Sequence, residues 1–543
     1  MGATLRALRA LVLLLGFYLL SLGLLAALIG LDVLVFTWGH GPLTVKVGFI
    51  TVLLAIPVVR GMLMLRTPKG DDGAGIQVTE ADEPRLWALV RELAAEAGTR
   101  APDRILLTGD VNAAVSEDPR LLGLLPGRRR LFLGVPLLTG LTEAQLRSVL
   151  AHEYGHFTGG DTRLSALVVR GRVQIGRVIG QFHAAADDKV AADRARQERA
   201  SAKRIAKGKK AKQIDTTGVG ATYRTMARIY TAYGKLYLRA SLSTARGQEY
   251  AADLTAARIA GRDATASALR EIPVLSASHD FYIDSYATLG LQARMLPPRG
   301  EFFGGFGRLL SAREAELVKL RSGLPEEPAG PYDSHPPIAE RVRRIEALPA
   351  DGRTDEAKDS ALSLLTDPAR TLAALEDAVL VDELLSYPRA ADWQELLDAS
   401  MAAGLSATQT PLHRALAGYT GQPATLPALL DVIDEGRLWR LAEQLPLSEE
   451  AAAAKGRAFR EFVRPGLHRS LRTMVLAEFS SRSLLHWEFS WTRPATVRLP
   501  GWGSETEDDG PEAALEAAVD AALADHPDTT ALRALLPPAV QNA

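Results

Sequence analysis

The chain opens with two apolar stretches of about the length of membrane helices. Ala10–Leu31 contains no charged residue, and Leu43–Leu65 contains only Lys46 and Arg60, each near an end. At about 1.5 Å per residue, the first stretch can cross the roughly 30 Å hydrocarbon core of a bilayer. The second has a shorter uncharged centre, and its cations can extend to the headgroups. The pattern predicts a two-helix transmembrane hairpin as an anchor, residues 1-69.

Positive charge gathers on one side of this hairpin. Arg6 and Arg9 precede it, and Arg66 and Lys69 follow it. By the positive-inside rule both ends lie in the cytoplasm. A cleaved signal peptide is the alternative, but the apolar run exceeds a usual signal core and no small-x-small cleavage site follows it. We therefore predict a multi-pass protein of the cell membrane, with the lipid bilayer as a partner and its other domains facing the cytoplasm.

The pattern changes after the glycine-rich linker 70–75. Glu80–Ala97 repeats apolar residues at helical spacing, which predicts an amphipathic helix. Arg104–Leu107 and Arg130–Val135 have the composition of strands, and Val111–Val115 between them fits an edge strand. These runs predict a small β-sheet early in the second domain.

Helices dominate the rest of that domain, which we expect to cover residues 76-348. Thr142–Phe157 is amphipathic, Ala221–Ala260 is helical, and Pro337–Leu348 follows a loop rich in proline and glycine. Between them, 187-217 is dense in Lys, Arg, Ala and Asp, which predicts a charged linker or a solvated helix.

The last third of the chain, residues 350-543, is rich in alanine and leucine with helical periodicity. Trp487–Leu499 alternates enough to form a pair of strands. We predict a separate, mainly α-helical domain, whose role the sequence does not indicate. The fold class expected for the whole chain is α+β and mostly α-helical.

Composition limits the chemistry of the chain. The 543 residues contain no cysteine, which excludes disulfides, thiol catalysis and cysteine-ligated metal sites. A formal net charge of -1 gives no general attraction for polyanions, so we expect no nucleic-acid partner. Any metal ion must therefore be held by histidine and carboxylate side chains.

A candidate metal site occurs on the predicted helix Thr142–Phe157. It contains His152-Glu153-Tyr154-Gly155-His156, an HExxH sequence. Two histidines four residues apart on a helix project from one face and can bind one zinc ion, while Glu153 lies beside the open coordination position as a general base. Two ordinary helix histidines are the alternative, but that does not explain Gly155, which is costly inside a helix and indicates close packing.

A third ligand is offered by the predicted helix Ala221–Ala260. It contains Glu249 and, one turn later, Asp253. Glu249 would bind zinc, and Asp253 could accept a hydrogen bond from the outer nitrogen of a ligand histidine. A surface pair of carboxylates is the alternative reading, since an ExxxD spacing alone is common.

These motifs resemble the membrane-anchored zinc metallopeptidases that include the HtpX-like heat-shock proteases and the CAAX prenyl proteases, a gluzincin group. The resemblance rests on HExxH, the downstream ExxxD and Ser334-His335-Pro336-Pro337, in that order. It implies a zincin-like helical metallopeptidase domain, in which His335 and Arg341 stabilise the oxyanion. It also implies that Asn112 and Ala113 bind substrate on the edge strand. The chain departs from the HtpX-like pattern because the segments between the zinc motifs are too charged to span lipid.

Together these observations predict a membrane-anchored zinc metalloendopeptidase that hydrolyses peptide bonds of membrane-associated or misfolded proteins. One Zn2+ per chain would be bound by His152, His156 and Glu249, and protein or peptide substrates are the expected partners. The alternative is a non-hydrolytic zinc-binding membrane regulator or scaffold that acts through the C-terminal helices. The sequence makes no prediction of oligomeric state.

Overall fold

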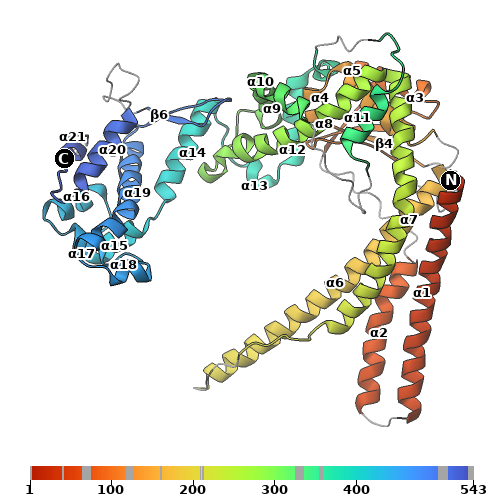
Figure 1. Ribbon diagram of the computed structural model, residues 1–543, viewed down its shortest axis with the longest axis horizontal. Helices are drawn as coiled ribbons and strands as arrows, with labels where there is room; N and C mark the ends of the chain where they lie inside the picture. Colours follow the sequence, from red (N-terminus) through yellow and green to blue (C-terminus); the bar gives the residue numbers. More distant parts are fainter. Residues whose placement is uncertain are drawn as a thin grey trace. The chain divides into compact units, whose positions relative to one another are not determined.

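The computed structural model is mostly helical, with two small sheets among the residues that it describes (Figure 1). The described residues are 3–38, 42–63, 75–117, 127–158, 162–207, 210, 213–323, 335–353, 359–498 and 511–535. They form two compact units, Met1–Ser276 with Val318–Pro368, and Ala277–Leu317 with Ala369–Ala543. Residues 277–317 group with the second unit although they lie within the expected 76-348 domain, so the division into functional domains stays a prediction.

Four long helices form a bundle in the first unit. They are α1 (Ala3–Trp38), α2 (Pro42–Leu63), α6 (Thr162–Ile205) and α7 (Ala221–Ala260). Their shared core is made of buried apolar side chains, among them Phe17, Leu54, Val58, Phe182 and Tyr230. The charged segment 187-217 was expected to be either a linker or a solvated helix. It is helical as far as Ile205, where α6 ends.

The two N-terminal helices differ in how well their length and apolar composition suit a membrane crossing. Within the described part of the chain, one helix is long and apolar enough to do so, at Val12–Trp38, whereas α2 has only a shorter apolar stretch, Thr44–Val59. Composition thus supports one N-terminal membrane helix. The second crossing and the cytoplasmic orientation stay predictions.

A four-stranded sheet lies next to the bundle in the first unit. Its strands are β1 (Gly75–Val78), β2 (Arg104–Thr108), β3 (Ala113–Glu117) and β4 (Arg129–Gly134), in the order β1-β2-β4-β3. β2 and β4 are parallel, and β3 pairs antiparallel with β4 so that Ala113 faces Leu133. The expected sheet and its edge strand are confirmed, but β1 was not expected because its four residues follow a glycine-rich linker.

Shorter helices complete the first unit, and the helix with the HExxH sequence, which contacts β3, is one of them. They are α3 (Pro84–Glu96), α4 (Val135–Gly140), α5 (Glu143–Gly155), the first part of α8 (Arg262–Tyr282), the last part of α10 (Glu314–Ser322), the turn η4 (Ala361–Leu364) and α11 (Ile338–Glu346). At the start of α5, the Thr142 side chain accepts from the Gln145 N–H and the Gln145 side chain accepts from the Thr142 N–H. This capping box satisfies two backbone donors and fixes where the helix begins.

Helix α5 packs closely on α7 at Gly155. A Cβ at this position would lie 2.8 Å from the Cα of Ala252 and 3.1 Å from its Cβ. The glycine inside the HExxH sequence therefore allows two helix backbones to approach, which confirms the close packing expected there.

Gly155→Ala should lower the free energy of unfolding by about 1–3 kcal/mol, because overpacking forces the two helices apart. Zinc binding should weaken as well, since the displaced segment of α7 includes Glu249. The measurement is thermal unfolding together with zinc titration. Gly176→Ala in α6 is the matched control, because an added Cβ there meets no atom within 4 Å. Equal behaviour of the two variants would contradict the packing argument.

In its described residues the second unit is helical apart from one strand pair. Its elements are the last part of α8, the turns η2 (Ile283–Ala287) and η3 (Leu289–Ala293), α9 (Glu301–Ala312), the first part of α10, α12 (Pro368–Val379), α13 (Asp382–Leu385), α14 (Trp393–Ala407), α15 (Pro411–Thr420), α16 (Leu426–Asp434), α17 (Leu438–Ala442), α18 (Glu449–Ala453), α19 (Arg457–Ser481), β5 (His486–Glu488), β6 (Thr496–Arg498), α20 (Pro511–Ala522) and α21 (Thr530–Leu535). The strand pair expected in Trp487–Leu499 is confirmed by the antiparallel pairing of β5 and β6.

Candidate metal centre

The two histidines of the HExxH sequence lie at the C-terminal end of α5. His152 is in the last turn, and His156 is the C-cap residue, still with helical backbone angles. Their ring centroids are 4.9 Å apart and the rings are nearly perpendicular. Their side chains are 14% and 30% exposed, so solvent can reach both imidazoles although each is largely buried.

Helix α7 brings Glu249 to these histidines. One carboxylate oxygen, Oε2, lies 3.6 Å from His152 Nε2, and the other, Oε1, lies 3.7 Å from His156 Nε2. The ligand atoms of the three residues all lie within 4.8 Å of one another. Since zinc binds nitrogen and oxygen ligands at about 2.0–2.2 Å, three donors at such separations can share one ion. The structure thus brings together the three residues that the sequence predicts as metal ligands.

The hydrogen bonding of Glu249 also fits a metal ligand. Its Oε2 atom is buried and has no hydrogen-bond partner of suitable geometry, although His335 Nδ1 lies 3.1 Å away. A buried carboxylate oxygen without a partner is costly, and a cation at this point would remove the cost. Two imidazoles and one carboxylate are a donor set that zinc accepts.

Asp253 and Arg341 surround the ligands on the buried side. Asp253 Oδ1 lies 3.0 Å from His152 Nδ1, which fixes the ring so that its other nitrogen faces Glu249. Arg341 donates from Nε to Asp253 Oδ2 at 2.9 Å and from Nη2 to Oδ1 at 2.6 Å. Only 8% of Arg341 is exposed, and its guanidinium is directed at Asp253 and not at solvent. Sequence spacing did not indicate this two-bond contact, because it joins residues on separate helices.

His335 is the most exposed residue of the group. It precedes α11 and two prolines, which keep it out of the helix, and 68% of its side chain is accessible. Its Nδ1 atom lies 3.1 Å from Glu249 Oε2, and this contact raises the pKa of His335. Ser334, the preceding residue of the motif, lies outside the described residues. The oxyanion roles expected for His335 and Arg341 stay predictions.

Glu153 lies between the metal ligands and the sheet edge. Burial raises the pKa of its carboxyl, while the charge of His152 and a hydrogen bond from the backbone of Val115 lower it in part. A raised pKa suits a group that must accept a proton and later release it. Val115 belongs to the edge strand β3, and this contact with Glu153 had no signal in the sequence.

Asn112 and Ala113 mark the start of the same strand. The Asn112 N–H donates to the carbonyl of Asp110, and the Asn112 carbonyl accepts from the Gly134 N–H. Ala113 is the first residue of β3 and pairs with Leu133. These contacts hold the strand in place, and the substrate role expected for the two residues stays a prediction.

The pKa values of the ligands predict how zinc binding depends on pH. Burial lowers the pKa of His152, but its contacts with the Asp253 and Glu249 carboxylates outweigh burial and raise that pKa to about 9. Burial and the charge of His152 lower the pKa of His156 to about 4. Burial opposes ionisation of Glu249, yet contacts with His152 and His335 hold its pKa well below the ordinary range. At pH 7, therefore, only His152 must lose a proton to bind metal.

Zinc binding at pH 7 should then release about one proton per ion, and the apparent affinity should rise up to about tenfold per pH unit until pH approaches 9. Titration calorimetry in buffers of different ionisation enthalpy measures this proton directly. Binding that releases no proton at pH 7 would show that His152 is already neutral in the metal-free protein.

A helix with HExxH, a second helix with a third ligand and an adjacent sheet edge define a metalloprotease class. Residues 80–348 match the profile described as Peptidase family M48, and this part of the chain belongs to that family. The family membership indicates a protease, and M48 peptidases are zinc-dependent.

One curated relative supports the same assignment. The chain is similar to the "Protease HtpX homolog" of Herminiimonas arsenicoxydans, with 26% identity over 142 residues. The match covers 25% of this chain and 45% of that protein, so the chain spans less than half the length of this relative. No solved structure matches the chain.

Proposed function

We propose that this protein is a membrane-anchored, zinc-dependent metalloendopeptidase that cleaves membrane-associated or misfolded proteins. The observation that carries the proposal is the meeting of His152, His156 and Glu249, whose ligand atoms lie within 4.8 Å of one another. The family of residues 80–348 supports peptide hydrolysis as the reaction. The activity requires that the three residues bind one zinc ion and that Glu153 act beside it.

In this mechanism the bound zinc would lower the pKa of water to about 7 and polarise the substrate carbonyl. Glu153 accepts a proton as water attacks the peptide carbon and then delivers it to the leaving amine. Its raised pKa favours the first of these transfers, because it makes the carboxylate a stronger base. Asp253 keeps His152 in the tautomer that binds metal through Nε2, and Arg341 keeps Asp253 in place.

The exposed His335 is well placed to act on the developing charge. Its Nδ1 atom lies 3.1 Å from Glu249 Oε2, which places the imidazole beside the proposed zinc ligands. We propose that it donates a hydrogen bond to the oxyanion, because its side chain is largely accessible beside the ligands. Arg341 instead contacts Asp253 and Glu249. We propose that it supports the tetrahedral intermediate indirectly, because its positive charge holds these two carboxylates in place.

The free edge of β3 suits an extended peptide. Among the described residues this strand pairs with β4 as its one neighbouring strand, and on the Glu153 side the Val115 backbone bonds the Glu153 carboxylate. We propose that substrate adds to this edge near Asn112 and Ala113, so that the scissile bond lies by Glu153. Helices α1 and α2 would anchor the protein from the cytoplasmic side, where the flanking positive charges place both ends.

The test is cleavage of casein by detergent-purified protein before chelation, after chelation and after zinc is restored. The proposal predicts that activity disappears with the metal and returns with it. Metal-bound protein that does not cleave casein or any other unfolded protein would instead support a zinc-binding regulator. Activity that is unaffected by chelation would contradict the proposal.

A further inference from the structure

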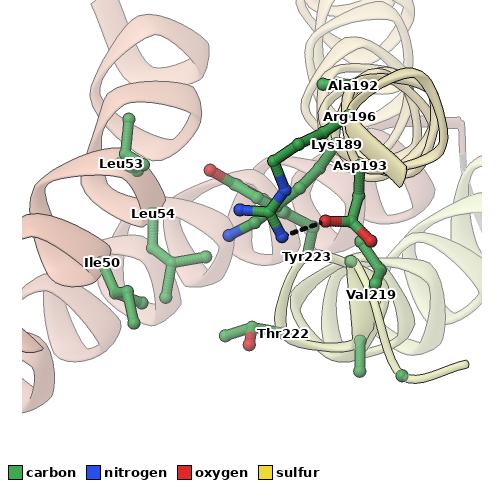
Figure 2. Close-up of a pocket in the computed structure, with 13 residues that line it drawn as sticks. Ile50, Leu53, Leu54, Lys189, Ala192, Asp193, Arg196, Val219, Thr222 and Tyr223 are labelled. Atoms are coloured by element: carbon green, nitrogen blue, oxygen red, sulfur yellow. Dashed lines mark hydrogen bonds and ion pairs between the residues drawn. The ribbon is translucent and has the colours of Figure 1, made fainter. Parts of the chain in front are cut away.

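A pocket of about 440 Å³ lies between α2, α6 and the beginning of α7, away from the metal centre (Figure 2). One wall is apolar and comes from Ile50, Leu53 and Leu54 of α2. The opposite wall is polar, and its side chains are Lys189, Asp193, Arg196, Thr222 and Tyr223. The pocket thus joins a hydrocarbon-like surface to a charged one.

The charged wall has an excess of positive charge. Figure 2 shows the Arg196 guanidinium reaching into the space between α6 and α2, with its Nη2 atom 2.5 Å from Asp193 Oδ1. The Lys189 ammonium lies 5.6 Å from the centroid of the Tyr223 ring. Two cations face one carboxylate, and the Arg196 side chain is 81% exposed. Such a surface ion pair is weak, so Arg196 can bind a second anion at little cost.

The surroundings of the hairpin indicate at what level a membrane would meet this pocket. Helix α7 packs along α1 as far as its middle, where Tyr230 bonds Ser21 and contacts Phe17. On this same part of α7, Arg224 and Arg228 are exposed. Charged side chains therefore lie beside the base of the hairpin, which is the end where α1 begins and α2 ends. This disfavours placing that end in the centre of a bilayer.

Beyond the pocket the exposed side chains of the hairpin are mostly apolar, and the exposed Lys46 among them has a long side chain that can extend toward the headgroups. Its exposed side chains include Phe36 at 73%, Trp38 at 85%, Val45 at 75% and Phe49 at 65%. From Ile50 to the start of α2 at Pro42 the helix rises about 12 Å, close to half of the roughly 30 Å hydrocarbon thickness. The bare tip matches one leaflet.

We propose that this pocket binds an anionic phospholipid, with the phosphate at Lys189 and Arg196 and an acyl chain along Ile50, Leu53 and Leu54. The headgroup level then crosses α2 beside the pocket, and the tip of the hairpin enters a single leaflet from the cytoplasmic side, so that α1 does not cross the membrane although its stretch Val12–Trp38 is long and apolar enough to do so. This differs from the two complete crossings expected from the sequence. The inference rests on the proposed membrane anchoring but not on the proposed catalysis.

Lipid selectivity tests the pocket. The full chain in detergent is titrated with fluorescent phosphatidylglycerol and, separately, with fluorescent phosphatidylcholine, with anisotropy as the readout. Wild type should bind phosphatidylglycerol at least about tenfold more tightly, since each cation near a lipid of net negative charge contributes about fivefold, whereas the choline of phosphatidylcholine cancels its phosphate charge. The variant Lys189→Gln with Arg196→Gln should lose this preference.

The matched control is Arg199→Gln with Lys203→Gln, which removes the same charge from exposed positions of α6 outside the pocket. It should retain the preference. An equal loss in both variants, no preference in wild type, or full displacement of the lipid by millimolar inorganic phosphate would overturn the lipid site. Casein cleavage, measured in parallel, reports separately on the proposed function.

Labelling of Trp38→Cys tests the depth of the hairpin, since the native chain has no other cysteine to react. In sealed vesicles washed with carbonate, a membrane-impermeant maleimide should label this position from neither side. Labelling from the side opposite the protease domain would overturn the single-leaflet insertion in favour of a complete crossing. Loss of the protein in the carbonate wash would instead refute the membrane anchoring itself.

Discussion

Glu153→Gln should lower the rate of peptide hydrolysis by about 10²–10⁴-fold while zinc stays bound. The amide has almost the shape of the carboxylate but cannot accept the proton that attacking water releases. None of the three metal ligands is changed, so metal content should remain that of wild type. The measurement is casein cleavage and zinc content on the same preparation.

Glu143→Gln is the matched control, because Glu143 lies in the first turn of the same helix, far from the ligands along the chain. It should cleave at nearly the wild-type rate. Undiminished proteolysis by pure Glu153→Gln protein would refute the role of Glu153 as the base.

Glu249→Gln should weaken zinc binding by more than 100-fold, a larger effect than the 10–100-fold typical of outer partners of metal ligands. The variant loses the negative charge that lies within 3.7 Å of both histidines. Activity should fall with the metal and return only in part when zinc is added in excess. Competition with a fluorescent zinc chelator measures the affinity.

Glu346→Gln serves as the control, since this carboxylate is 46% exposed and pairs with Arg270 at the surface. It should bind zinc as wild type does. Unchanged zinc affinity in Glu249→Gln would remove Glu249 from the ligand set and leave the HExxH histidines without their third partner.

Much of the metal centre could be predicted from the sequence because its parts are local. Four-residue spacing places His152 and His156 on one helix face, and the same spacing joins Glu249 to Asp253. Gly155 predicted a close helix approach, which the structure supplies at Ala252. The meeting of the two helices, however, was inferred from resemblance, because no local pattern specifies which distant helix packs there.

What the sequence missed depends on tertiary contacts. The hydrogen bonds between Arg341 and Asp253 join helices that are 88 positions apart in the chain. Strand β1 is too short for a clear alternating pattern. The apolar content of α1 predicts a membrane helix but not its depth, because depth depends on which charged helices pack beside it.

X-ray absorption at the zinc edge tests the central claim most directly, since it identifies the metal and its ligands without depending on any substrate. The measurement uses the detergent-purified full chain, with zinc content determined on the same sample. We predict about one zinc per chain, with nitrogen and oxygen neighbours at about 2.0–2.2 Å and the multiple-scattering signature of two imidazoles. A folded protein that binds no zinc, or a zinc spectrum without imidazole, would contradict the account.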